Sequence, residues 1–147
     1  MFDHIGVVVS DFAKSKAFYA QALAPVADST DPVERVAFAC GFLLRGVLAY
    51  QGAVRAMIAA TITRPELAGT RPGLRFGLID EALAPLSSTL MVADPAGLAQ
   101  LKNDLAAVVS AEALFVLTDL AGLPPGDAIA SLIRTATTIT AAALQQA

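Results

Sequence analysis

The chain has 147 residues, of which 56% are hydrophobic and 16% charged, so it fits one globular domain and is not intrinsically disordered. The formal net charge of −3 argues against a surface built to hold nucleic-acid phosphates. A single cysteine, Cys40, excludes an internal disulfide and favours a reducing, cytoplasmic location. The mean hydropathy of +0.63 exceeds what a small monomer normally hides, which predicts self-association or a large apolar ligand site.

The N-terminal 30 residues differ in pattern from the rest of the chain. Residues 2–9 form a short β-branched run that predicts a strand, and a helix is expected from Asp11 to about Ala24, where Pro25 ends it. From Asp31 onward every signal is helical. We therefore divide the chain into residues 1–30, a strand and a helix, and residues 31–147, a helical unit.

The helical unit begins with a strong start signal that is repeated later. Asp31 and Asp94 each precede a proline, as expected of an N-cap followed by proline at the first helical position. Helices are predicted over residues 32–51, 53–63 and 74–86, with Gly52 as an interruption and a loop over 64–73. One continuous helix of about seven turns is expected after Asp94 and ends at Gly122, and a last helix follows over 127–146.

Two apolar windows, residues 36–50 and 105–123, raise the question of a membrane span. Arg45 interrupts the first window, and Glu112 and Asp119 interrupt the second. An acid near the centre of a span costs about 3 kcal/mol, and the N-terminus lacks the basic segment of a signal peptide. We therefore expect packed helices and no membrane partner.

The opening segment carries a family resemblance. The sequence FDHIGVVVSD over residues 2–11, followed by SKAFY over 15–19, resembles the first strand and helix of the glyoxalase/vicinal-oxygen-chelate family, a match that covers residues 1–26. In that family the histidine at the position of His4 is often a metal ligand. A catalytic metal site needs about three protein ligands, and His4 is the only histidine. We therefore expect no metal or other cofactor, with His4 as the metal ligand only in the alternative of a partial enzyme.

A second resemblance covers residues 31–147. The segments DPVER (31–35), AVRAMI (53–58), GLRFGLIDEAL (73–83) and EALFVLTDLAGL (112–123) are similar to the C-terminal ligand-binding and dimerisation domain of TetR-type transcriptional regulators. The resemblance implies an all-α helical bundle whose last two long helices pair with their copies, and an apolar pocket among the middle helices. The family's helix-turn-helix should precede this region, where the glyoxalase-like strand and helix stand instead. With only Lys14 and Lys16 as basic residues before Asp31, we expect no direct nucleic-acid binding.

Bulky apolar side chains lie in the region where such relatives bind ligands. They are either core or the lining of an apolar small-molecule pocket: Phe38, Phe42, Tyr50, Met57, Phe76 and Phe115. Arg45, Arg55 and Arg75 either orient an anionic ligand or form ion pairs with Asp80, Glu81 or Glu34. Cys40 is expected to be a buried hydrophobe, and no nucleophile–base pair is identified, so we expect no catalytic residues and no enzyme.

The last two long helices present more apolar surface than one partner helix covers. Each fully buried Leu, Ile or Val contributes about 1.5–3 kcal/mol, enough in sum to outweigh association costs of about 4–15 kcal/mol. The sequence therefore predicts a two-fold homodimer. The expected interface residues are Leu105, Val108, Glu112, Val116, Ile129, Leu132, Ile133, Ala136 and Ile139.

These observations favour a small-molecule-sensing, dimerising domain of regulator type without a DNA-binding part. The alternative is a partial metal-dependent enzyme of the glyoxalase class, and a third possibility is a purely structural fusion product.

Overall fold

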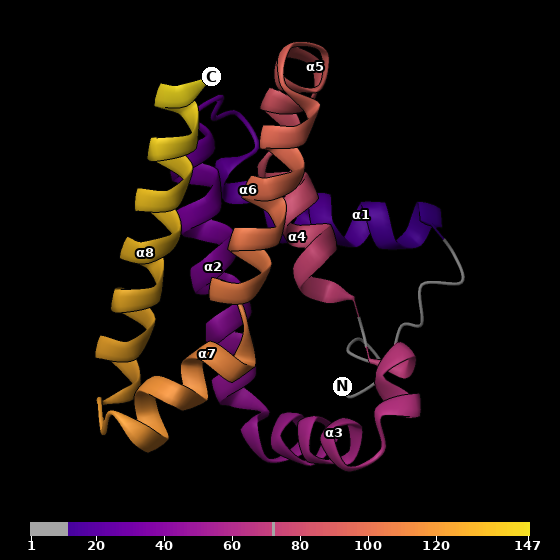
Figure 1. The fold of residues 1–147 in the computed structure, drawn as a ribbon, viewed down its shortest axis with the longest axis vertical. Coiled ribbons are helices and arrows are strands. Elements are labelled where there is room, and N and C mark those ends of the chain that lie inside the picture. The colour runs from indigo at the N-terminus through magenta and orange to yellow at the C-terminus, as the bar shows by residue number, and fades with distance from the viewer. Residues whose placement is uncertain (1–11, 72) are drawn as a thin grey trace.

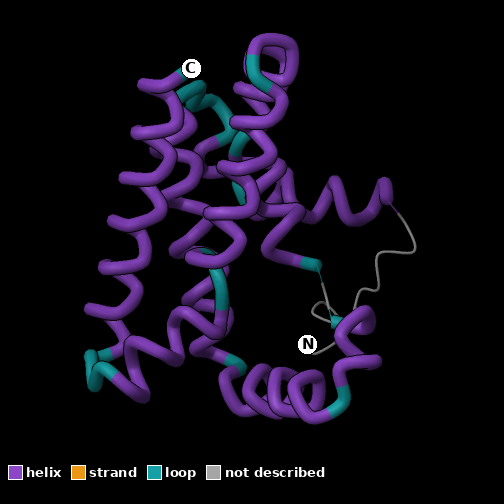
Figure 2. Tube along the Cα trace, in the orientation of Figure 1, coloured by secondary structure: helices purple, strands orange, loops and turns teal. Residues whose placement is uncertain are grey.

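The computed structural model describes residues 12–71 and 73–147, and every regular element among them is helical (Figures 1 and 2). The all-α prediction is confirmed for this part of the chain, whereas the strand predicted over residues 2–9 lies outside it. The elements in chain order are α1 (Phe12–Ala22), η2 (Ala24–Val26), α2 (Pro32–Ala49), α3 (Gln51–Thr63), η3 (Pro65–Thr70), α4 (Leu74–Ala82), α5 (Ala84–Ala93), α6 (Pro95–Val108), α7 (Ala111–Phe115), η4 (Val116–Leu120) and α8 (Pro125–Gln146).

The core forms around α2, which packs along α8 and against α4, while α6 packs against both α8 and α4 (Figure 1). α2 buries side chains at helical spacing because its apolar face is wide. Leu23 and Val26, which precede α2, belong to the same core as the later helices. The fully buried centre includes Cys40, Leu44, Leu78, Leu105 and Leu114.

Both predicted aspartate caps are confirmed. The Asp31 carboxylate accepts a hydrogen bond from the backbone N–H of Val33 at 2.9 Å, and Pro32 follows as the first residue of α2. The Asp94 carboxylate accepts from the N–H of Gly97 at 2.9 Å, with Pro95 opening α6. These caps satisfy backbone donors that a helix leaves unpaired at its start, so they fix both helix boundaries.

The predicted seven-turn helix after Asp94 is wrong, because α6 ends at Val108. Ser110 is extended (φ −150°, ψ 152°), and its hydroxyl accepts from the N–H of Ala113 at 3.0 Å to cap α7. The same hydroxyl donates to the carbonyl of Ala107 at 2.9 Å, which also satisfies the end of α6. η4, a π-helical turn, then ends at Leu120, and Gly122, two residues later, has a φ of +71° that agrees with the predicted stop there.

The single helix predicted over residues 74–86 is also two helices. α4 ends at Ala82, and α5 begins at Ala84 with Pro85 in its first turn, where a proline is tolerated. Other boundaries differ less: α8 starts at Pro125, two residues before the predicted start, and the predicted loop after Arg64 contains η3.

α2 and α3 meet at Tyr50 and diverge by 93°. The break therefore lies two residues before the predicted interruption at Gly52, which itself lies inside α3. None of the described helices alone has the length and apolarity that a membrane span requires; α2 and α3 meet that test only together, across their sharp bend.

Candidate functional site

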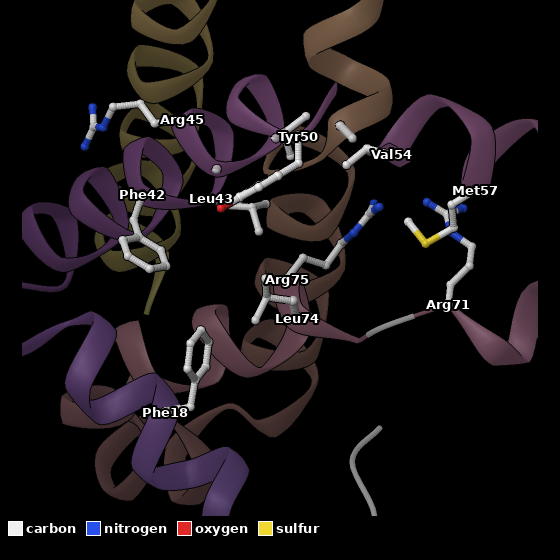
Figure 3. A pocket seen from close by; sticks show the side chains of 13 residues that line it. Phe18, Phe42, Leu43, Arg45, Tyr50, Val54, Met57, Arg71, Leu74 and Arg75 are labelled. Atoms are coloured by element: carbon white, nitrogen blue, oxygen red, sulfur yellow. The ribbon is translucent and has the colours of Figure 1, made fainter. Parts of the chain in front are cut away.

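A half-open cleft of about 410 Å³ lies where the bend separates α3 from α2 (Figure 3). Its volume is within the range of about 300–1,000 Å³ that small-molecule sites occupy. Residues of α1, α2, α3, α4 and α7 form its walls. The apolar lining includes Phe18, Phe42, Leu43, Val54, Met57 and Leu74.

The two ends of the cleft differ in chemistry. Figure 3 shows Phe18 and Phe42 on one side, whereas Arg71 lies beside Met57 on the other and Arg75 extends toward Val54. Arg45 also lines the cleft, on the side of Phe42, but its exposed side chain extends away from Arg71 and Arg75 (Figure 3). None of the described lining residues is acidic. The cleft is therefore amphipathic, with an aromatic end and a basic end.

The arginines of the basic end share one carboxylate. Glu112 of α7 accepts a hydrogen bond from Arg75 at 2.8 Å through one oxygen and from Arg71 through the other. Arg75 also donates to the carbonyl of Ala106 at 3.2 Å. All three charged side chains are between 23% and 38% exposed, so solvent reaches them from the cleft.

The pKa of Glu112 reflects two opposing effects. Burial raises the pKa of the carboxyl, but the hydrogen bonds from Arg71 and Arg75 and the positive charge of Arg75 outweigh burial and hold it below its ordinary value. Glu112 is therefore ionised at neutral pH. Two guanidinium groups and one carboxylate then leave one positive charge at the basic end.

Arg55 belongs to a separate contact. Its guanidinium donates to both carboxylate oxygens of Asp119, at 2.5 and 2.9 Å, and lies 3.8 Å from the centre of the Phe115 ring. This pair ties α3 to η4 and lies outside the cleft lining. Within residues 12–71 and 73–147, Arg45, Arg55 and Arg75 form no ion pair with their predicted partners: the ion-pair partners are Asp119 for Arg55 and Glu112 for Arg75.

Half of the predicted pocket residues line the cleft: Phe42, Tyr50 and Met57. The other three, Phe38, Phe76 and Phe115, lie elsewhere. Phe38 and Phe115 are half-buried against the core, and Phe76 is 56% exposed because α4 turns it outward.

Sequence reasoning missed eight of the thirteen lining residues, and Phe18 and Arg71 are the two that matter most for the chemistry of the cleft. Phe18 belongs to the segment that resembles the glyoxalase family, although α1 brings it to the cleft, and Arg71 falls in the Pro- and Gly-bearing segment between helices. The spacing of Arg71 and Arg75, four residues apart on either side of a helix start, is a weak signal that they converge.

The predicted dimer residues fall into two groups. Leu105, Ile129, Leu132 and Ala136 are buried inside the single chain, where they stabilise the core. Val108, Glu112, Ile133 and Ile139 are half-buried, and Val116 is 51% exposed. Only the half-buried residues and Val116 keep solvent-exposed surface that a second copy of the chain could cover.

The remaining reactive groups are not gathered into a site within residues 12–71 and 73–147. His4 lies outside these residues, and the described His, Cys, Asp and Glu side chains form no group of three that could hold a metal ion. Cys40 has no exposed surface, and burial raises the pKa of its thiol to about 12 although the charge of Arg45 acts in the opposite direction. The cleft is thus the feature on which a function can be based.

Comparison with known proteins adds no relative. No family model, no curated protein and no solved structure matches this chain. The two family resemblances therefore stay predictions, and the chemistry of the cleft has to support any proposal.

Proposed function

We propose that this chain is a helical small-molecule-binding domain of the sensing type, as in the ligand domains of TetR-type regulators. The observation that supports this proposal is the amphipathic cleft between α2, α3 and α4. A concave, mostly apolar site with a few polar groups at fixed positions is the usual form of a small-molecule site. Its walls come from helices distant in sequence, so occupancy would change how these helices pack.

The test uses Nile red, a neutral dye that fluoresces in apolar surroundings. Gly46 lies on the cleft wall, and a Cβ atom there would meet nothing within 4 Å, so Gly46→Phe introduces an aromatic side chain at the cleft from an unobstructed Cβ position. Gly52 has equally open surroundings but does not line the cleft, so Gly52→Phe is the matched control. We expect the wild type and Gly52→Phe to bind the dye and Gly46→Phe to lose it; equal binding by all three would contradict the proposal.

The proposed sensing domain acts as a homodimer that uses the exposed part of the predicted interface. Val116 is 51% exposed on η4, beside Leu120 at 83%. Light scattering at micromolar concentration should give twice the mass of one chain. Val116→Glu should then give a monomer, whereas Ile62→Glu, a change at a 71% exposed position on α3, should not. A single-chain mass for the wild type would refute the dimer while leaving the ligand proposal intact.

A further inference from the structure

We infer that the cleft takes an amphipathic carboxylate, a monoanion with an apolar tail, whose head group is held by Arg71 and Arg75. This inference rests on the proposed ligand-binding function and adds the chemical class of the ligand. It follows from where the arginines and the apolar side chains lie in the cleft, and from the net charge of the arginine cluster.

The positions of the charges separate head from tail. Arg71 and Arg75 lie at the end of the cleft near Met57 and Val54, and Phe18 and Phe42 lie at the opposite end (Figure 3). Arg45 lies on the side of Phe42, but its exposed side chain extends away from the other two arginines. A ligand that satisfies both ends must itself have a charged end and an apolar end. Guanidinium groups match carboxylates in geometry because two N–H donors face two oxygens.

The charge balance sets the charge of the head group. Arg71 and Arg75 share one counter-ion, Glu112, which is ionised at neutral pH. One further negative charge makes the cluster neutral, whereas a cationic head group would face two guanidinium groups in a partly desolvated site. A neutral head group would leave the positive charge uncompensated.

The N-terminal turn of α4 adds positive potential at the end of the cleft that holds Arg71 and Arg75. Leu74 and Arg75 open this nine-residue helix, and no side chain among the described residues caps it. The partial positive charge of a helix start therefore adds to that of the two arginines. The side chains of Arg71 and Arg75 already bind the Glu112 carboxylate, which indicates that this end of the cleft stabilises a carboxylate.

The test compares three ligands with the same apolar tail: octanoate, 1-octanol and octyltrimethylammonium, each displacing Nile red. We expect octanoate to bind at least about tenfold more tightly than octanol, since charge-assisted hydrogen bonds exceed neutral ones. The cation should bind most weakly. Equal affinity of octanoate and octanol would overturn the ligand class but not the proposed function, whereas failure of Nile red to bind would overturn the function itself.

Variants then locate the head group. Arg75→Gln should lower octanoate affinity about tenfold without changing octanol binding, which also reports that the cleft is intact. Arg134→Gln removes the same charge from an exposed position of α8 and should change neither. Glu112→Gln should strengthen octanoate binding, because it removes the internal competitor for both arginines. Octanoate binding that responds equally to Arg75→Gln and Arg134→Gln, or that weakens in Glu112→Gln, would refute the inference.

Discussion

Arg35 is a buried cation that ties three segments together, so its removal should be strongly destabilising. It is 5% exposed, and its guanidinium donates to the carbonyl oxygens of Glu81 at 2.7 Å, Val26 at 2.9 Å and Ala82 at 3.0 Å. The Glu81 carboxylate lies 3.8 Å away and adds a weaker attraction. Glu81 and Ala82 end α4, where the backbone N–H of Leu83 also donates to the Glu81 carbonyl, so Arg35 adds a cap to the end of α4 from another helix.

The expected cost of Arg35→Met follows from these contacts. A hydrogen bond to a charged group contributes about 1.5–3 kcal/mol, and Arg35→Met removes three of them. The carbonyls of Val26 and Glu81 each keep a backbone donor, from Ser29 and Leu83, so the cost stays near the low end of that sum. We expect about 3–5 kcal/mol, a large fraction of the roughly 5–15 kcal/mol by which domains are stable. At a slope of about 2 kcal/mol per M, the urea midpoint should fall by about 1.5–2.5 M.

Urea unfolding followed by circular dichroism at 222 nm measures this shift. Arg134→Met is the matched control, because Arg134 is an exposed residue within α8, and a surface change should stay within about 0.5 kcal/mol. Arg35→Lys keeps the charge but not the planar fork, so its midpoint should lie between wild type and Arg35→Met. A midpoint of Arg35→Met equal to that of Arg134→Met would refute the account of α4 capping.

Three further predictions concern packing and titration. Gly77→Ala places a Cβ about 2.0 Å from Cζ of Tyr19, so α1 should lose hydrogen-exchange protection despite alanine's higher helix propensity of about 1 kcal/mol; unchanged protection would contradict the α1–α4 contact. The pKa of Glu112 is lower in the folded chain than its ordinary 4.5, so its stabilisation is complete above that value and is lost as the pH falls below it. The difference in unfolding free energy between wild type and Glu112→Gln should therefore shrink on acidification to pH 3, and a constant difference would refute this linkage. Cys40, with its thiol pKa near 12, should react with a thiol reagent at pH 8 only after unfolding, and a fast reaction of the native chain would refute its burial.

The helix starts could be predicted from the sequence because their signals are local. Asp31 and Asp94 act within three residues of themselves through their own side chains. Ser110 carries a cap signal of the same kind, but the apolar periodicity runs through it from Leu105 to Leu114 and favours one long helix. Apolar periodicity indicates which face of a helix is buried. It does not indicate where one helix ends and the next begins in a new direction, because the apolar faces of both helices are buried.

The cleft could be predicted only in part because it depends on the angle between helices. Phe42, Tyr50 and Met57 follow from being bulky and apolar near the α2–α3 junction, but no sequence pattern specifies the 93° bend. That bend decides which side chains face the cleft and which pack in the core. Phe76 and Leu74 are two residues apart on α4, so they point to different sides, and only Leu74 reaches the cleft.

Charge locates the site better than hydrophobicity does. The apolar surplus is divided among the core, the cleft and exposed side chains on α3, α4 and η4, so it does not by itself identify one surface. The basic residues, by contrast, are 10 in a chain of net charge −3, and three of them line one cleft whose described lining holds no acid. A cleft with the opposite sign to the whole chain attracts anions locally and is screened by salt. Octanoate binding should therefore weaken with ionic strength, while octanol binding should not.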